Sequence, residues 1–497
     1  MKPTVSYQGA SIAPEEFFAR YQRSAAALSA LGVGEGDVVA LMLRNEPMLL
    51  ELMLAVRWLG AHWCPVNWHF KAEELRYILE DSGAKVCIAH TDLLEPLADA
   101  CPAGLRVYTV PPPGQAASGT RVDWAAFRDG EQRPAAAQYP PRGAMLYTSG
   151  TTGRPKGIRR RPATPEQSAA NLVIQRLTLG LAPGMRALVS APMYHSAPNS
   201  FSVGVAQENG SLWIEPRFDA ERTLQMIEQH RITHTYLVPT MYVRLLRLPD
   251  EVKRRYDLSS MRFVSSTGSP CAPDIKRAMI EWWGPVINEA YGSSELGYMT
   301  VLPSEDALRK PGSAGRPLPG VSMRILDEEG RELPRGTAGL IYIRQPAYAD
   351  FTYNNNDAAR GRMERDGHMT MGDVGYLDED GFLFIVDRSA DMVISGGVNI
   401  YPAEIEAVLQ MMPGVADCAV FGIPDAEFGE ALAAAVQPLP GATLTSGQVI
   451  EHLQAHLAGY KVPRVVAFHA ELPREDTGKI FKRRLREPYW AGSQRRI

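Results

Sequence analysis

Helical and strand-like stretches alternate through the first ninety residues of the chain. Residues 13–31 carry apolar side chains at the spacing of an amphipathic helix, and residues 38–42 form a continuous apolar run of the kind found in buried strands. The predicted elements are, in order, helix 13–31, strand 38–42, helix 49–59, a strand ending at 64–67, helix 73–82 and strand 86–89. This alternation predicts an α/β fold with doubly wound sheets.

Further strands follow, and each ends in a polar or Gly/Pro-rich turn. The predicted strands are 144–146, 187–190, 235–238, 262–265 and 286–289. Ligands of open α/β sheets bind outside the carboxyl ends of the strands. We therefore expect these turns to converge on one crevice.

The pattern changes near residue 387. Pro402 can begin a helix, and apolar residues at 405, 408, 409 and 412 continue it. Residues 415–421 and 432–436 predict strands, and residues 449–457 predict another helix. The sequence thus predicts a large N-terminal domain, 1–387, and a small α+β C-terminal domain, 388–497.

Composition narrows the function classes. Hydrophobic residues make up 45% and charged residues 22% of the 497 residues, and the formal net charge of −4 offers no basis for nucleic-acid binding. The chain has no apolar run of about 18 residues and no apolar signal core at its start. Five cysteines without C-x-x-C spacing predict free thiols. We expect a cytoplasmic protein without an integral membrane segment.

Residues 147–157, YTSGTTGRPKG, carry the strongest chemical signal. Glycines let backbone N–H groups turn toward an anion, hydroxyls add donors, and Lys156 adds a positive charge. This composition predicts a polyphosphate-binding loop, and it is not a Walker loop because Gly157 follows Lys156. The stretch resembles the phosphate loop of the adenylate-forming superfamily, which includes acyl-CoA synthetases.

Other segments resemble the same superfamily, in the same order along the chain. They are PMYHSAP at 192–198, STGSP at 266–270, EAYGSSE at 289–295, MGDVGY at 371–376, the stretch 387–402 and LPREDTGKI at 472–480. The resemblance implies that Glu295 binds Mg²⁺, that Asp373 and Arg388 hold the ribose, and that Lys479 bridges the carboxylate and the α-phosphate. An ionised carboxylate suits both a hard cation and a ribose diol.

The resemblance implies a complete set of site residues. The catalytic residues are Lys479, Glu295 and His195, where His195 gates the acyl pocket. The nucleotide and coenzyme A residues are Thr148, Ser149, Gly150, Thr151, Thr152, Lys156, Gly268, Ser269, Glu289, Ala290, Tyr291, Gly292, Ser294, Asp373, Arg388, Gly396 and Gly397. The metal residues are Glu295 and Thr152.

Three positions depart from the family pattern. Ser294 and Met371 each stand where the family more often has Thr, and the pivot of the small domain falls on Ser389 or Ala390 instead of Asp or Lys. Small residues at 268 and 292 indicate a roomy acyl pocket. Two basic runs, 159–161 and 482–484, fit either anion binding or a solvated surface.

The implied activity is that of an ATP-dependent carboxylic acid:CoA ligase, with Mg²⁺ and coenzyme A, in which a mobile C-terminal domain rotates between adenylation and thioester formation. The acid is a fatty acid or a related organic acid; aryl and alicyclic acids fit almost as well. The alternatives are a free-standing adenylation enzyme that loads a separate carrier protein and a nucleotide sensor without turnover. A homodimer is compatible with the sequence, which does not determine the oligomeric state.

Overall fold

The chain forms two compact units in the computed structural model. The structure describes residues 1–115, 121–130, 138–148, 155–388, 391–395, 398–425, 427–474 and 480–491. The first unit consists of Met1–Pro311, Pro317–Val321 and Gln345–Glu364, and the second of Gly312–Arg316, Ser322–Arg344 and Arg365–Ile497. The predicted boundary at 387–389 falls inside the second unit, and as a functional division it stays a prediction.

The main sheet of the first unit has the strand order β15-β14-β13-β12-β11-β9-β10-β1-β2. These strands are β1 (Thr4–Tyr7), β2 (Ala10–Ile12), β9 (Arg186–Val189), β10 (Ser211–Ile214), β11 (His234–Leu237), β12 (Phe263–Ser266), β13 (Ile287–Ser293), β14 (Gly297–Leu302) and β15 (Arg316–Pro317). Strands β1, β10, β9, β11, β12 and β13 run parallel to one another, whereas β2 and β14 pair antiparallel with β1 and β13. The predicted α/β class with doubly wound sheets is confirmed.

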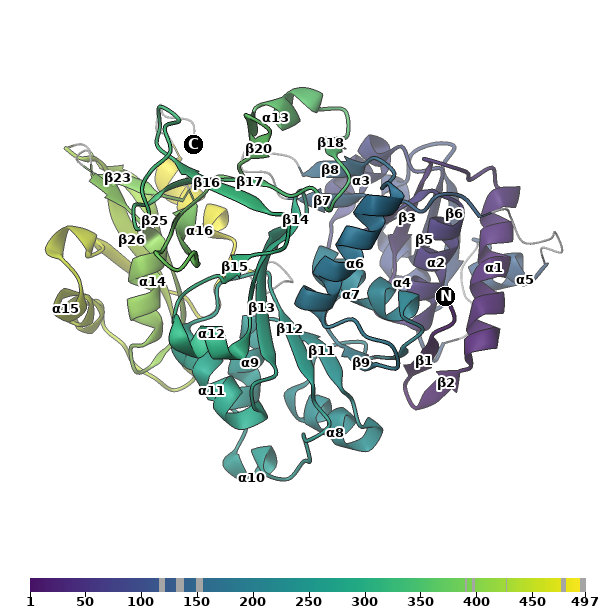
Figure 1. The fold of residues 1–497 in the computed structure, drawn as a ribbon, viewed down its shortest axis with the longest axis horizontal. Helices are drawn as coiled ribbons and strands as arrows, with labels where there is room; N and C mark the ends of the chain where they lie inside the picture. Colours follow the sequence, from purple (N-terminus) through teal and green to yellow (C-terminus); the bar gives the residue numbers. More distant parts are fainter. Residues whose placement is uncertain are drawn as a thin grey trace. The chain divides into compact units, whose positions relative to one another are not determined.

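Helices cover both faces of this sheet. They are α1 (Pro14–Ala30), α6 (Pro165–Leu179), α7 (Ser196–Gln207), α8 (Ala220–His230), α9 (Pro239–Leu246), α10 (Asp250–Lys253), α11 (Pro273–Trp283) and α12 (Ser304–Arg309). Figure 1 shows α6 and α7 to one side of β11–β14 and α9 and α11 to the other. Local sequence features mark the start of two of these helices: α1 has Pro14 in its first turn, and Thr164 and Gln167 form a capping box for α6.

A second sheet of the first unit has the order β4-β3-β5-β6, with every pair parallel. Its elements are β3 (Val38–Met42), α2 (Pro47–Trp58), β4 (His62–Pro65), α3 (Ala72–Ser82), β5 (Val86–His90), α4 (Thr91–Leu94), the 3₁₀ turn η1 (Glu95–Ala100), β6 (Arg106–Val110) and α5 (Trp124–Gly130). Every residue of β3, β4 and β5 is buried. Burial on both faces explains why these strands appear as continuous apolar runs rather than as alternating ones.

A small antiparallel sheet flanks the predicted phosphate loop. Its strand pairing shows that one strand was predicted at the wrong residues. Its order is β18-β8-β7, formed by β7 (Leu146–Thr148), β8 (Lys156–Arg160) and β18 (Phe351–Tyr353), and α13 (Asp357–Gly361) follows β18. The predicted strand at 144–146 was placed too early. Pairing with β8 moves the strand to Leu146–Thr148, because the ladder joins Leu146 to Ile158 and Thr148 to Lys156.

The second unit holds two more sheets. The first has the path β19-β20-β17-β21-β22, with β16 beside β17. Its strands are β16 (Ser322–Leu326), β17 (Gly339–Arg344), β19 (Glu364–Arg365), β20 (His368–Met369), β21 (Asp373–Leu377) and β22 (Leu383–Arg388). The other has the path β24-β23-β26-β25, with β27 beside β26. Its elements are β23 (Val393–Ser395), β24 (Val398–Ile400), α14 (Pro402–Gln410), β25 (Val415–Asp425), β26 (Gly429–Pro438), α15 (Ser446–His456), the 3₁₀ turn η2 (Gly459–Lys461), β27 (Val465–Phe468) and α16 (Lys482–Trp490).

The Asp387 side chain on β22 connects this strand with the C-terminal part of the second unit. The Asp387 carboxylate accepts hydrogen bonds from the backbone N–H of Ala403 (3.0 Å) and of Arg388 (2.7 Å). Ala403 lies in the first turn of α14, where unpaired N–H groups favour an anion. The unit therefore extends across the predicted boundary.

Two further features concern membrane-spanning helices and cysteines. No helix among the described residues has the length and apolar character that a membrane span requires. The five cysteines are free thiols, of which Cys101 is partly exposed and the rest are buried.

Candidate active site

Glu295 lies at the tip of a tight β-hairpin. Strand β13 extends beyond the predicted 286–289 to Ser293, and β14 pairs back along it after a turn at residues 294–296. The Ser293 hydroxyl accepts a hydrogen bond from the N–H of Leu296 (2.9 Å), which closes the turn. The Glu295 side chain is buried, so its partners decide what it can bind.

Two hydroxyl groups donate to the Glu295 carboxylate. Thr148 Oγ1 lies 3.0 Å and the Tyr353 hydroxyl 3.1 Å from Glu295 Oε1. Burial raises the pKa of Tyr353, so the phenol stays protonated and keeps donating. No Lys or Arg of the described residues forms an ion pair with this carboxylate, which leaves its negative charge available to a cation. The structure thus brings the end of β7 and the Glu295 turn together.

The two ends of the phosphate loop are fixed by strand pairing. Thr148 and Lys156 face each other in the β7–β8 ladder, so the loop of residues 149–155 starts and ends at one rung. The Lys156 ammonium lies 5.2 Å from the centre of the Tyr353 ring. The predicted site residues Ser149, Gly150, Thr151 and Thr152 fall outside the described residues.

Arg160, at the end of β8, is engaged with the backbone and does not form a solvated surface. Its Nη2 donates to the carbonyl oxygens of Ser294 (2.8 Å) and Glu295 (2.5 Å), and its Nη1 donates to Ala349 (2.9 Å). Its neighbour Arg159 is exposed and donates to the Gly36 carbonyl (2.9 Å). The basic run 159–161 is therefore not uniform: Arg160 contacts the Glu295 turn, whereas Arg159 lies on the surface.

In the other basic run, 482–484, Arg483 is exposed and forms an ion pair with Glu487 at 2.8 Å, whereas Lys482 is largely buried. Lys482 Nζ forms an ion pair with Glu406 Oε1 at 2.9 Å, and both side chains are largely buried. Burial alone would lower the pKa of Lys482, but the carboxylates of Glu406, Asp391 and Asp387 outweigh it and raise the pKa. Lys482 thus serves the packing of the second unit.

Glu289 differs from Glu295, although both belong to the same motif. Its Oε2 lies 2.8 Å from Lys276 Nζ on α11, and both side chains are nearly inaccessible. Burial raises the pKa of Glu289, and the lysine opposes the shift. The Glu289 side chain is therefore a partner of Lys276, and the predicted nucleotide role of residues 289–291 does not rest on this carboxylate.

The two small residues assigned to a roomy pocket have different reasons for being glycine. Gly268 has φ +100°, and the nearest atom to an added Cβ is the Tyr236 hydroxyl at 4.0 Å. An added side chain at Gly268 would therefore meet open space, and the positive φ is the reason that glycine is favoured there. At Gly292 an added Cβ would lie 2.6 Å from the Gly297 carbonyl oxygen. Gly292 is required by the close pairing of β13 and β14, so its use as a sign of a roomy pocket was wrong.

His195 precedes α7 in a cluster of rings. Its backbone N–H donates to the Pro192 carbonyl (3.1 Å), and its ring centre lies 4.2 Å from that of Tyr194. Tyr194 in turn packs edge-on against Trp68 at 4.6 Å. The half-buried imidazole thus packs against Tyr194, which is itself packed against Trp68.

Asp373 and Arg388 lie side by side on β21 and β22 of the second unit. They are a register pair, and Arg388 Nε donates to Asp373 Oδ1 at 3.1 Å. The carboxylate is buried, whereas the guanidinium is about half exposed. The structure thus brings together the two residues that the resemblance assigns to the ribose. The predicted residues Gly396, Gly397 and Lys479 fall outside the described residues.

Sequence reasoning missed two residues of this site, Tyr353 and Lys276, and did not predict that Arg160 contacts the Glu295 turn. Tyr353 and Glu295 are 58 positions apart, and Arg160 and Glu295 are 135 apart. No local pattern links such distant residues. The only sequence signal was the basic run itself, which did not distinguish Arg160 from its neighbours.

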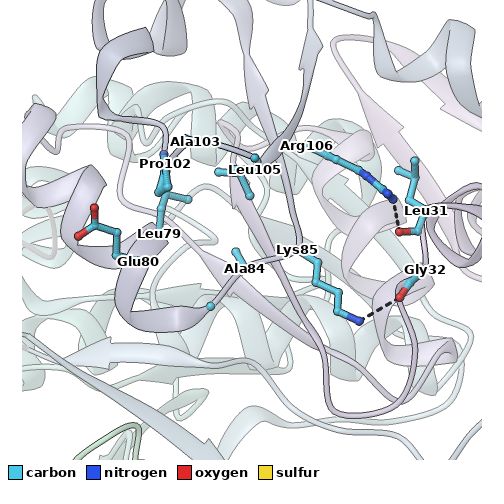
Figure 2. Close-up of a pocket in the computed structure, with 12 residues that line it drawn as sticks. Leu31, Gly32, Leu79, Glu80, Ala84, Lys85, Pro102, Ala103, Leu105 and Arg106 are labelled. Carbon is cyan, nitrogen blue, oxygen red and sulfur yellow. Dashed lines mark hydrogen bonds between the residues drawn. The ribbon is translucent and has the colours of Figure 1, made fainter.

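A surface hollow elsewhere in the first unit is unrelated to these residues. It has a volume of about 590 Å³ and lies among the end of α1, α3 and the start of β6 (Figure 2). Lys85 Nζ donates to the Gly32 carbonyl (3.1 Å), and Arg106 donates to the Leu31 carbonyl. Both cations therefore cap the carboxyl end of α1. No predicted site residue is among the described residues that line the hollow.

The site geometry can be set against known proteins. A family model described as AMP-binding enzyme matches residues 2–350, and one described as AMP-binding enzyme C-terminal domain matches residues 404–479. The chain belongs to the AMP-binding enzyme family. The predicted membership of the adenylate-forming superfamily is confirmed, and so is the predicted enzyme class, an acid–thiol ligase.

Its relatives include enzymes for different acids. The indoleacetate–CoA ligase of Aromatoleum aromaticum is 34% identical over 477 residues, which is 94% of this chain and 91% of that protein. The long-chain-fatty-acid–CoA ligase FadD13 of Mycobacterium tuberculosis is 33% identical over 94% of this chain and 91% of its own length. The crystal structure of ATP-bound MatB from Rhodopseudomonas palustris has a TM-score of 0.85 and 33% identity, covering 98% of this chain and 96% of that one.

Proposed function

We propose that this AMP-binding enzyme is an ATP-dependent carboxylic acid:CoA ligase for a fatty acid or a related organic acid, including aryl acids. The observation that carries the proposal is the Glu295 carboxylate, buried, held by neutral hydroxyls and located next to the end of the phosphate loop. In the first half-reaction, an oxygen of the acid attacks the α-phosphorus of ATP. The bond to pyrophosphate breaks, and an acyl-adenylate remains.

The residues around Glu295 fit a magnesium ion. Mg²⁺ prefers oxygen ligands and usually takes one or two carboxylates together with phosphate oxygens. Glu295 supplies a carboxylate whose described partners are hydroxyl groups, and the Thr148 hydroxyl supplies a further oxygen. Thr152, which the resemblance also assigns to the metal, lies outside the described residues. A bound Mg²⁺ would neutralise part of the triphosphate charge.

The remaining charge is met by the chain's own donors. Lys156 ends the phosphate loop with an ammonium, and the resemblance assigns Lys479 to the bridge between acid and α-phosphate. Such donors stabilise charge that develops on the transferring group. Tyr291 would lie against the adenine, Ser294 would contact the α-phosphate, and the turn at Gly268 would lie along the ligand.

The Asp373–Arg388 pair suits the ribose. Arg388 donates to one oxygen of Asp373, and an ionised carboxylate accepts several hydrogen bonds, which suits the two hydroxyls of a ribose. The half-exposed guanidinium can donate to ribose oxygens as well. This pair would fix the sugar and thereby orient the α-phosphate.

The second half-reaction transfers the acyl group to coenzyme A. The thiolate attacks the activated carbonyl, the carbon–sulfur bond forms, and AMP leaves. In this proposal the C-terminal domain rotates about residues 387–389, which withdraws Lys479 and brings Gly396 and Gly397 to the thiol. His195, supported by Tyr194, would exclude water from the acyl-adenylate.

A panel of acids tests the function. ATP–pyrophosphate exchange and coenzyme A-dependent AMP release would be measured with indole-3-acetate, ferulate, octanoate and palmitate. At least one acid should support both reactions, and the best substrate should identify the acid class. ATP–pyrophosphate exchange without AMP release in the presence of coenzyme A would indicate that the acyl acceptor is another molecule, such as a carrier protein. Failure of every acid in both assays would refute the ligase.

A further inference from the structure

Arg160 is a partly buried residue whose guanidinium donates to carbonyl groups instead of pairing with an acid. No carboxylate of the described residues forms an ion pair with it, and burial lowers its pKa. Its contacts are the carbonyl oxygens of Ser294, Glu295 and Ala349. The rings of Tyr348 and Phe351 lie 5.5 and 5.8 Å from the guanidinium carbon. Withdrawing a charge from water is costly unless it makes strong contacts, so these three carbonyls favour the position in which Arg160 lies.

The contacts of Arg160 fix the backbone of the Glu295 turn. One nitrogen donates to two successive carbonyls, which sets the orientation of the peptide planes on both sides of the Glu295 Cα. A charged donor makes hydrogen bonds about twice as strong as those of a neutral donor. Arg160 also belongs to β8, the strand that leaves the phosphate loop. The turn is therefore held at a defined position relative to β8, which begins at Lys156.

Tyr353 fixes the side chain on the same residue. Its hydroxyl donates to Glu295 Oε1, and it lies on β18, which pairs with β8. In that ladder Tyr353 faces Ile158 and Phe351 faces Arg160. Two neighbouring strands of one small sheet thus supply the groups that hold Glu295, one by its backbone and one by its carboxylate.

We propose that Arg160 and Tyr353 are positioning residues that hold Glu295 ready for the divalent cation that arrives with the nucleotide. The inference rests on the proposed function, because it takes Glu295 as the metal carboxylate. Groups that orient a metal ligand commonly matter as much as about ten- to a hundredfold in metal affinity. A purely structural role would instead lower stability and leave metal affinity unchanged.

The chain offers a matched control for Arg160. Arg159 is the preceding residue of the same strand, and it also donates to a backbone carbonyl, that of Gly36. It is exposed and has no contact with the Glu295 turn among the described residues. Replacing either arginine by glutamine removes one positive charge from β8, so a comparison of the two isolates the contact with the turn.

The experiment measures cation binding without turnover. Mn²⁺ would be titrated into the full-length protein with α,β-methylene-ATP present, and free Mn²⁺ would be followed by electron paramagnetic resonance. Arg160→Gln should raise the apparent Kd for Mn²⁺ by about ten- to a hundredfold, and Tyr353→Phe by about tenfold. Arg160→Lys should give an intermediate value, because an ammonium is a point charge without the planar fork of a guanidinium. Arg159→Gln should match the unmodified protein.

Three outcomes are decisive. A Kd for Mn²⁺ that stays within about twofold of the unmodified protein in both Tyr353→Phe and folded Arg160→Gln overturns the inference. If Arg160→Gln does not fold, Tyr353→Phe decides alone, because it keeps the ring and removes only the hydroxyl. If the unmodified protein shows no nucleotide-dependent Mn²⁺ binding, the metal role of Glu295 fails, and with it the proposed function at this residue.

Discussion

Two carboxylates assigned to the nucleotide are held in opposite ways. Glu295 accepts hydrogen bonds from the neutral hydroxyls of Thr148 and Tyr353, and Arg160 contacts only its backbone. Asp373 instead accepts from the guanidinium of Arg388. Both side chains are buried to a similar degree, so burial does not account for the difference.

The partners of each carboxylate determine what it can bind. A carboxylate held by hydroxyls keeps its full negative charge and attracts a cation. A carboxylate already paired with a guanidinium gains little from a second cation but still accepts hydrogen bonds from neutral hydroxyl groups. Glu289 is a third case: paired with Lys276 and inaccessible, it stabilises the fold. One residue type thus has three uses, distinguished by its nearest donor.

The strongest test of this comparison is Glu295→Gln. The amide keeps the size and the hydrogen-bonding capacity of the side chain but removes the charge that binds the cation. We expect ATP–pyrophosphate exchange to fall by about a hundred- to a thousandfold and the Mg²⁺ concentration for half-maximal rate to rise. The exposed Glu281 on α11 offers a control, and Glu281→Gln should leave both unchanged. A normal Mg²⁺ requirement in Glu295→Gln would break the comparison.

Asp373→Asn should produce a smaller and chemically different loss. Hydrogen bonds to charged groups contribute roughly 1.5–3 kcal/mol each, which corresponds to about ten- to a hundredfold in the KM for ATP. The unmodified enzyme should prefer ATP over 2′-deoxy-ATP, and the variant should lose that preference while its Mg²⁺ requirement stays normal. Steady-state kinetics with both nucleotides measures this. If Asp373→Asn shifts the metal requirement instead, the assignments of the two carboxylates must be exchanged.

The sequence was most informative where a local pattern determines the structure. Strand β3 was predicted with its observed bounds, Val38–Met42, because a strand buried on both faces must be apolar throughout. Strand β7 was misplaced because pairing with β8, not the polarity of its residues, makes Tyr147 and Thr148 extended. The Asp373–Arg388 contact could be anticipated only through the family resemblance. The roles of Arg160 and Tyr353 depend on contacts between distant segments, which single-sequence patterns do not contain.

A pair of glycine variants sharpens the view of the Glu295 hairpin. Gly292→Ala would place a Cβ 2.6 Å from the Gly297 carbonyl oxygen and force β13 and β14 apart. We expect a loss of about 2 kcal/mol in the free energy of unfolding, together with a raised Mg²⁺ requirement, because the turn moves. Gly268→Ala meets open space and only the strain of φ +100°, so it should cost about 1 kcal/mol. Urea unfolding compares the two, and equal losses would contradict this account.

The smallest expected effect is the contribution of His62 to the pH dependence of stability. It must be known before the activities of Glu295 and Asp373 variants are compared at different pH values. Burial lowers the pKa of His62 from 6.5 to about 4. The unfolded chain therefore takes up a proton between these values while the folded protein does not. The contribution of neutral His62 to the free energy of unfolding is therefore complete above pH 6.5 and is lost as the pH falls toward 4. Between pH 7.5 and 5.5 the loss should be about 1 kcal/mol.

Thermal unfolding at these two pH values tests the effect. His62→Gln should lose less stability on acidification than the unmodified protein, and the exposed His69→Gln should behave like the unmodified protein. The same pH dependence in all three proteins would assign the acid sensitivity elsewhere. His234, whose pKa is also lowered by burial to about 4, is the next residue to examine.

The rung that joins Thr148 to Lys156 limits how this enzyme can be re-engineered for other nucleotides. The residues on either side of segment 149–155 are paired with each other and lie a fixed distance apart. An inserted residue would therefore lengthen the segment without moving its two ends. A phosphate-binding role for this segment requires backbone N–H groups that converge on one anion, and a changed length would disturb such an arrangement. Changes in nucleotide preference should consequently be reached by exchanging side chains at constant length, and libraries that vary the length of this segment should yield mostly inactive proteins.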